Sequence, residues 1–289
     1  MALWHTVTVI ISAANFIFGA LLFFGLFQKK TEPENAKYSL LLRILGLVFI
    51  AVALYRSNFV TSYQNRLAWY DTLFNSPFFI RCLAFCAELS FNGMIAAILL
   101  KMGKEMNPAG DRKLARAAEK LPIAGFACIF IAQFFAYASL IAQYKTALAI
   151  EETLWALAFF CYVPLVAMGL RQAKKQPAAF KGYQAFLIVM AVWCAGYLVF
   201  QCFGALPLHY AHISQDVGLV VPSDALRTAI FGFTKTRDFA VWGGTGFFIW
   251  HTGYFSLCSW MALLFMTAPR LRHNLLPIDK AAGPPYNGS

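Results

Sequence analysis

Seven long apolar stretches, separated by shorter polar segments, dominate the amino-acid sequence. They run over residues 6–28, 39–55, 76–100, 121–143, 154–170, 184–205 and 240–266. An α-helix needs about 20 mostly apolar residues to cross the ~30 Å hydrocarbon core of a bilayer, and these stretches are close to that length. Lipid-facing β-strands would alternate apolar with polar residues, which these stretches do not. The pattern therefore predicts an all-α polytopic membrane protein with a bundle of seven transmembrane helices.

The composition favours the same class of protein. Hydrophobic residues make up 60% of the 289 residues and charged residues only 13%, against roughly 45–50% and about 25% in soluble domains. A soluble fold of this size would have to expose much of that apolar surface to water. We therefore expect an integral, multi-pass protein of a plasma or inner membrane, with a seven-helix domain over 1–270 and a polar cytoplasmic tail over 271–289.

The positions of Lys and Arg predict how the helices are oriented. Most of these cations lie in the connections after the first, third and fifth stretches and in the tail, and the connection 101–120 is especially basic. The positive-inside rule places such segments in the cytoplasm, so we expect the N-terminus outside and the tail inside. The net charge of +11 is then a topology signal that requires no nucleic-acid partner, and it also favours contact with anionic lipids of the bilayer.

Polar residues inside the apolar stretches are the candidates for a functional site, because ionisable groups in hydrocarbon are costly. Glu88 is the only acidic residue deep in a predicted span. Arg81, Glu88 and Asn92 follow i, i+7, i+11 spacing and share one helical face. Counting from the span ends at about 1.5 Å per residue places further polar side chains near the level of Glu88. The sequence therefore predicts a polar layer at the midplane, and its other members are Asn15, Gln133 and His251.

Two interpretations of this layer remain open. Buried amides and a neutral Glu can simply hydrogen-bond the helices to one another, at about 0.6–2 kcal/mol each. Alternatively, Glu88 is a protonatable or cation-binding group, with Arg81 or His251 as its partner. The second interpretation predicts a protein that binds or translocates a small molecule or ion through the bundle.

A second group of residues lies where the second and third spans meet the outer surface. Arg56, Arg66 and Asp71 belong to an aromatic-rich connection and its flanks. Guanidinium groups match the geometry of carboxylates and phosphates, so this group is a candidate site for an anion or a lipid headgroup. The alternative is that aromatic residues anchor the connection in the headgroup layer.

The sequence lacks the residues that several kinds of chemistry require. Retinal binding needs a Lys within a span, and none lies well inside one. His209 and His212 have helical spacing but no evident third ligand, so we predict no metal site. The sequence holds no nucleophile elbow, P-loop or dinucleotide-binding motif. It therefore gives no reason to expect an enzyme, and it indicates no particular cofactor.

The seventh stretch is rich in glycine and aromatic residues, which allow close approach of backbones. Such a helix suits a flat apolar ligand such as a sterol, a carotenoid or a quinone, and it suits contact with lipid equally well. The same aromatic faces support an alternative function. The chain would then be a non-catalytic accessory subunit of a larger membrane complex, packing on partner subunits, lipids or pigments.

Overall fold

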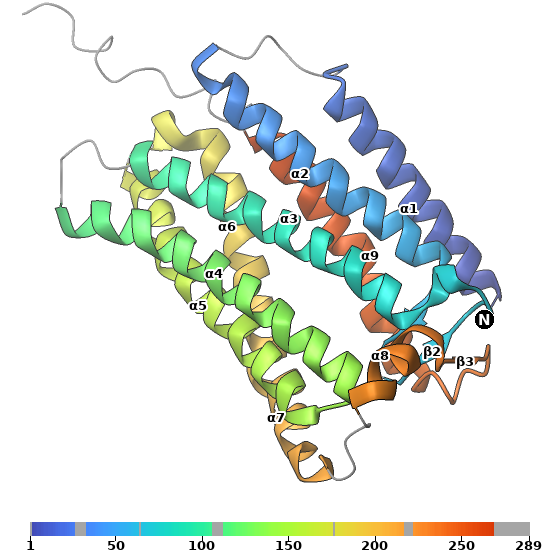
Figure 1. Cartoon of the computed structure of the whole chain (residues 1–289). Coiled ribbons are helices and arrows are strands. Elements are labelled where there is room, and N and C mark those ends of the chain that lie inside the picture. The colour runs from blue at the N-terminus through green and yellow to red at the C-terminus, as the bar shows by residue number, and fades with distance from the viewer. Residues whose placement is uncertain are drawn as a thin grey trace, which may run out of the picture.

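A computed structural model describes residues 2–26, 33–63, 65–105, 112–175, 177–216 and 222–268, and the predicted tail lies outside these ranges. Long helices run up and down through one bundle (Figure 1). They are α1 (Ala2–Phe23), α2 (Pro33–Asn58), α3 (Pro77–Glu105), α4 (Arg112–Ala142), α5 (Lys145–Lys175), α6 (Pro177–Phe200) and α9 (Gly244–Met266). Helices α1 to α6, the last continued through a short α7, are long and apolar enough to cross a membrane, as expected of an integral multi-pass protein.

The helices extend beyond the apolar stretches that predicted them. The fifth begins at Lys145 rather than near position 154, and the fourth begins at Arg112 rather than near 121. Lys, Arg, Glu and Ala are good helix formers, so a helix continues through residues that end an apolar stretch. Hydropathy alone therefore places these starts too late. The added turns of α5 bring Glu151 and Glu152 into the helix.

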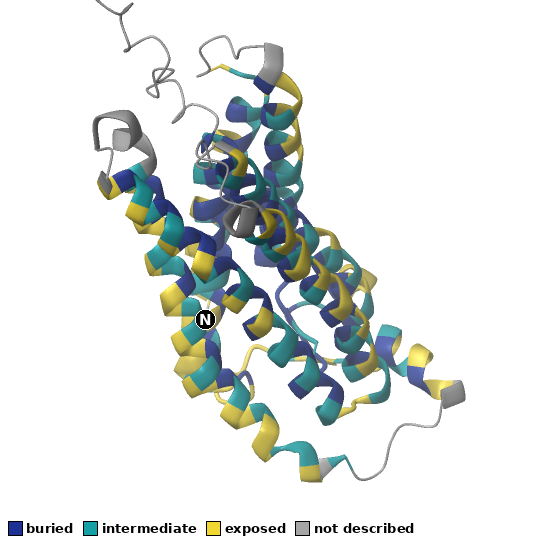
Figure 2. Cartoon of the chain, turned by 90° about the vertical axis from the view of Figure 1, so that its left-hand side faces the viewer, coloured by how far each residue is buried: buried dark blue, intermediate teal, exposed yellow. Residues whose placement is uncertain are grey.

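Helix α3 is central in the bundle. It contacts α2, α4, α5 and α9, whereas the contacts of α1 are with α2 and α9. Accordingly, 61% of the most apolar segment of α3 is buried inside the protein, against 28% of the most apolar segment of α1. The outward faces of the helices are exposed (Figure 2) and carry large apolar side chains such as Val192, Phe203 and Ile249. These faces are suited to contact with lipid chains.

Short elements close one end of the bundle, which we call the strand end. Strand β1 (Thr61–Ser62) pairs antiparallel with β2 (Leu67–Ala68), and β2 pairs parallel with β3 (Thr234–Lys235). Further short elements are η1 (Leu73–Asn75), η2 (Gln201–Ala205), α7 (Leu206–Ala211), η3 (Ile213–Gln215) and α8 (Pro222–Phe231). The pairing of β2 with β3 joins the segment before α3 to the segment before α9, which are far apart in the sequence.

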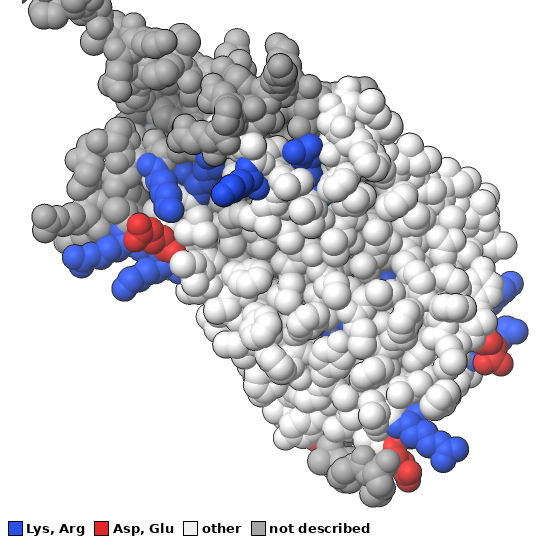
Figure 3. Space-filling view, turned by 45° about the horizontal axis from the view of Figure 1, so that its top comes forward, with Lys and Arg blue, Asp and Glu red and all other residues white. Residues whose placement is uncertain are grey.

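The opposite end of the bundle is basic. Lys and Arg side chains gather on this end of the molecule (Figure 3). The exposed cations of this basic end include Lys104, Arg116, Lys120, Arg171 and Lys174. The asymmetry of charge that the sequence indicates is therefore an asymmetry between the two ends of the folded bundle.

Candidate functional site

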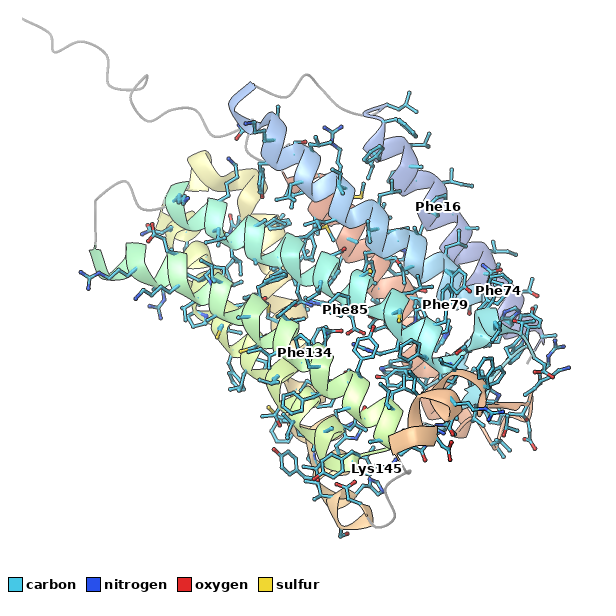
Figure 4. The ribbon with its side chains drawn as sticks, in the orientation of Figure 1. Phe16, Phe74, Phe79, Phe85, Phe134 and Lys145 are labelled. Carbon is cyan, nitrogen blue, oxygen red and sulfur yellow. The ribbon has the colours of Figure 1, made fainter. Side chains whose placement is uncertain are left out.

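A buried ion pair within α3 forms the centre of the candidate site. Arg81 and Glu88 lie about two helical turns apart, so their side chains project from one face. The two terminal guanidinium nitrogens of Arg81 donate to the two carboxylate oxygens of Glu88 at 3.2 and 2.9 Å. The side chains are only 1% and 9% exposed. Phe85, labelled in Figure 4, lies between them in the sequence and marks their level on α3. This two-point contact holds both side chains inside the protein.

Helix α4 supplies a further acceptor for Arg81. The Nη2 atom of Arg81 also donates to Oε1 of Gln133, and the amide nitrogen of Gln133 donates to the Ile129 carbonyl oxygen at 3.2 Å. Asn92, one turn beyond Glu88, donates to the backbone oxygen of Glu88 at 3.0 Å and not to its carboxylate. The structure thus brings together two members of the predicted polar layer, Glu88 and Gln133, through Arg81. Asn92 shares the α3 face of Glu88, as predicted from its spacing.

Helix α5 adds two carboxylates, Glu151 and Glu152, which precede the apolar stretch 154–170 and were not among the predicted site residues. Oε1 of Glu151 lies 4.0 Å from Nη1 of Arg81, and the Glu151 side chain is 3% exposed. Oε2 of Glu151 has no hydrogen-bond partner among the described residues. Glu152 follows in the chain and is less deeply buried. We refer to Arg81, Glu88, Glu151 and Glu152 as the carboxylate cluster.

A π-helical turn places an amide against this cluster. Helix α6 continues into η2 (Gln201–Ala205), a π-helical turn with i→i+5 hydrogen bonds. Such turns are rare in proteins overall, and many of those that occur lie at functional sites. The amide nitrogen of Gln201 donates to Oε2 of Glu152 at 2.7 Å. Beyond this turn, Nε2 of His209 on α7 lies 4.0 Å from Oε1 of Glu152. His209 therefore lies on the strand-end side of the cluster, in contact with its most exposed carboxylate.

Tyr63, just after β1, covers Arg81 from the strand end. Its ring centroid lies 5.7 Å from Cζ of Arg81. Burial raises the pKa of the Tyr63 phenol far above its ordinary value of 10.0. The phenol is therefore neutral at physiological pH. The Tyr63 side chain therefore adds no charge to the carboxylate cluster, which already holds more carboxylates than guanidinium groups.

The structure places Asn15 and His251 away from the carboxylate cluster. Asn15 belongs to α1, and its Nδ2 has no hydrogen-bond partner among the described residues. His251 on α9 is buried against the rings of Trp4 and Phe255, with centroid distances of 5.1 and 4.4 Å. Equal depth along two helices does not make two side chains face each other, because depth gives no information about rotation around the axis.

The three residues predicted to form an outer anion site lie in three different environments. Arg66 donates to the backbone oxygen of Leu140 at 3.3 Å, where a cation complements the carbonyl groups at the end of α4. Asp71 is exposed. Arg56 is buried between α2 and α9, with its Cζ 5.0 Å from the centroid of the Phe255 ring. They do not form one site in this structure.

A shallow apolar groove of about 400 Å³ lies at the strand end beside α1 and α9, near the glycine-rich part of α9. Its lining residues include Trp4, Phe248, Ile249 and Gly253. Within the described part of the chain, no three His, Cys, Asp or Glu side chains are grouped as a metal ion would require. The sequence matches no known family model and no curated protein, and the fold matches no solved structure.

Proposed function

We propose that this chain is a multi-pass membrane protein that binds a proton at the carboxylate cluster, and that this proton accompanies the binding or translocation of a small molecule or ion through the bundle. The observation that carries the proposal is the ratio of charges: Glu88 and Glu151 both lie within salt-bridge distance of one buried guanidinium, and Glu152 follows Glu151 on α5. Arg81 is engaged at both terminal nitrogens by Glu88. Glu151 lies 4.0 Å from Nη1, which is beyond hydrogen-bond distance, so it gains only an electrostatic contact from Arg81.

A proton on Glu151 resolves this imbalance. An ionised carboxylate that is buried without adequate partners costs several kcal/mol, whereas a typical hydrogen bond contributes about 1 kcal/mol. Oε2 of Glu151 has no hydrogen-bond partner among the described residues. A protonated Glu151 carries no charge, and its hydroxyl becomes a donor. A purely structural network would be expected to balance its charges, and this cluster does not.

The charged groups near Glu151 have both signs. Arg81 on α3 attracts an ionised Glu151 across 4.0 Å, whereas an ionised Glu88 on α3 or Glu152 on α5 carries a like charge. The neighbouring amides, Gln133 on α4 and Gln201 after α6, are uncharged. Loss of the proton gives Arg81 a second anionic partner on α5. The protonation state of Glu151 therefore changes the attraction between α3 and α5, which is how a bound proton can alter the packing of the bundle.

We also propose that α9 is the seventh span and that the strand end faces outward. Helix α9 has 23 residues, about 35 Å at 1.5 Å per residue, and it packs along α1 and α2. With the basic end in the cytoplasm, this orientation follows the positive-inside rule. Tags on the two chain ends would then be accessible from opposite compartments. Accessibility from the same compartment would contradict the seven-span arrangement.

Infrared spectroscopy of the purified protein tests the proton site directly. We expect a carbonyl-stretch band of a protonated carboxylic acid that disappears as the pH is raised and is absent in Glu151→Gln. Glu119→Gln is the matched control, because Glu119 is an exposed carboxylate at the other end of α4; the band should remain. A spectrum in which none of the substitutions Glu88→Gln, Glu151→Gln and Glu152→Gln removes such a band would contradict the proposal.

Reconstitution tests whether proton binding is linked to transport. In vesicles that contain a pH-sensitive dye, an imposed membrane potential should drive proton uptake through the wild-type protein and through Glu119→Gln. Glu151→Gln should be inactive while it still folds. Equal proton uptake by wild type and Glu151→Gln would exclude the carboxylate cluster from the transport pathway.

A further inference from the structure

A second buried arginine lies at the end of α2 without a counter-charge. Arg56 is 4% exposed, and it makes no side-chain hydrogen bond or ion pair with the described residues. Its guanidinium lies over the rings of Tyr254 and Phe255, with Cζ 5.5 and 5.0 Å from their centroids. Contact with two rings is weaker than the hydration that a buried cation loses. The carbonyl groups at the end of α2 offset only part of the charge.

His251 stands beside Arg56 with an unused ring nitrogen. It is 2% exposed, and its ring contacts the same Phe255 ring that Arg56 covers. Nδ1 of His251 has no hydrogen-bond partner among the described residues. In the neutral tautomer that carries the proton on Nδ1, this atom is a donor. Arg56 and His251 therefore offer neighbouring donors, from α2 and α9, that no acceptor in the described part of the chain uses.

The carboxylate cluster does not supply the missing counter-charge. Glu88 is held at both oxygens by Arg81, and no carboxylate of the described residues lies within salt-bridge distance of Arg56. The Tyr254 ring packs against Arg56, with its centroid 5.5 Å from Cζ. Among the described residues, no ion pair links Arg56 to the carboxylate cluster.

We propose that Arg56 and His251 bind a small monovalent anion, a carboxylate or a halide, between α2 and α9. This site goes beyond the proton site proposed above and does not depend on it. A guanidinium provides two parallel donors for a carboxylate and an electrostatic contact for a halide. The aromatic rings around it exclude water, which strengthens the attraction between the bound anion and Arg56.

The test measures the thermal unfolding midpoint and the binding heat of the detergent-purified protein. The protein is first transferred into a buffer whose anion is a bulky sulfonate, and then chloride or acetate is added. We expect a saturable rise of the wild-type midpoint, because a ligand that binds the native state alone stabilises it. A response to both ions indicates a general small-anion site, and a response to one of them identifies the chemistry that the site selects.

Arg56→Gln should abolish this response and should be no less stable than wild type without added anion, because it removes an uncompensated buried charge. Arg237→Gln is the matched control, since Arg237 also lies over two rings, Trp69 and Tyr70, but is exposed; its response should equal that of wild type. If Arg56→Gln does not fold, Arg56→Lys and His251→Gln should each weaken the affinity about tenfold or more. No saturable response in wild type, or an unchanged response in the variants at Arg56 and His251, would overturn the proposal.

Discussion

Arg81 of α3 and Glu151 of α5 approach to 4.0 Å across the contact between two helices, while Glu88 holds the same guanidinium at 2.9 Å from within α3. Arg81 thus has one carboxylate on its own helix and another on a neighbouring helix. The first contact is independent of helix packing, and the second depends on it. This difference makes the cluster sensitive to the protonation of Glu151 and to any displacement of α5.

Removing Arg81 should destabilise the protein strongly. Arg81→Met leaves the surrounding carboxylates without a cation, and breaking a buried ion pair in this way costs about 3–5 kcal/mol. Arg81→Met combined with Glu88→Leu removes both members of the pair and should recover a large part of that loss. The measurement is the free energy of unfolding in mixed detergent. Effects of the two substitutions that simply add would show that Arg81 and Glu88 do not act as a pair.

His209 should control how fast protons reach the cluster. If the proton passes through His209 to Glu152, whose atoms lie 4.0 Å apart, then His209→Asn should slow hydrogen–deuterium exchange at the carboxylic acid band by about 10²-fold, as loss of a positioned acid–base group does. The equilibrium band should remain, which separates this prediction from the existence of the proton site. Added imidazole should restore the rate. His5→Asn, at a histidine bonded to the Asn58 backbone instead, should leave it unchanged.

Asp216 should stabilise the start of α5 in a pH-dependent way. Its carboxylate accepts hydrogen bonds from the backbone and hydroxyl of Thr146 and from the backbone of Lys145, which Figure 4 labels. Partial burial raises the pKa of Asp216, but these hydrogen bonds outweigh it and hold the pKa below the ordinary 3.8. Since the folded-state pKa is the lower one, the stabilisation is complete above about pH 4 and is lost as the pH falls further.

Asp216→Ala should therefore cost about 0.5–2 kcal/mol near neutral pH, as the loss of a helix cap does. The difference from wild type should shrink below about pH 4. Unfolding measured as a function of pH checks both statements. Asp71→Asn, at an exposed aspartate, serves as the control and should not change the pH profile.

The contact between α4 and α5 should tolerate no side chain at Gly125. A Cβ atom there would overlap the Tyr162 ring and lie 3.1 Å from the Ala158 carbonyl oxygen. Gly125→Ala should destabilise the protein by about 1–3 kcal/mol, as overpacking does. Gly196→Ala is the control on α6, where a Cβ meets no atom within 4 Å, and it should be neutral or stabilising by up to about 1 kcal/mol. Equal effects of the two substitutions would contradict this account of the packing.

The part of the site that the sequence could predict is the part that lies on one helix. The i, i+7 spacing of Arg81 and Glu88 is a property of helical geometry, so it needs no knowledge of the tertiary fold. The depth count along the helices predicts only the level of Gln133. It does not predict that Gln133 faces Arg81, because depth does not give the direction of a side chain around the axis of α4. The same depth count selected His251, which faces Trp4 and Phe255.

Glu151 was missed because the apolar stretch used to define the fifth span starts after it. The sequence does contain a pattern that indicates Glu151. Glu151, Trp155 and Ala158 follow i, i+4, i+7 spacing, so one face of the fifth helix continues toward its N-terminus through a carboxylate. The pairing of Asp216 with the start of α5 was not accessible in this way, because it joins residues 70 or more positions apart. Long-range contacts of this kind depend on the assembled bundle.

The parallel pairing of β2 with β3 links the segments that lead into α3 and α9. The Thr234 backbone nitrogen donates to the Arg66 backbone oxygen at 2.8 Å, and that of Thr236 donates to the Ala68 oxygen at 3.1 Å. Through these bonds the chain entering α3 is fastened to the chain entering α9. A tilt of either helix must then pivot about this fastening, and the amplitude of the motion grows with distance from it. Opening and closing between α3 and α9 would consequently be widest toward the basic end.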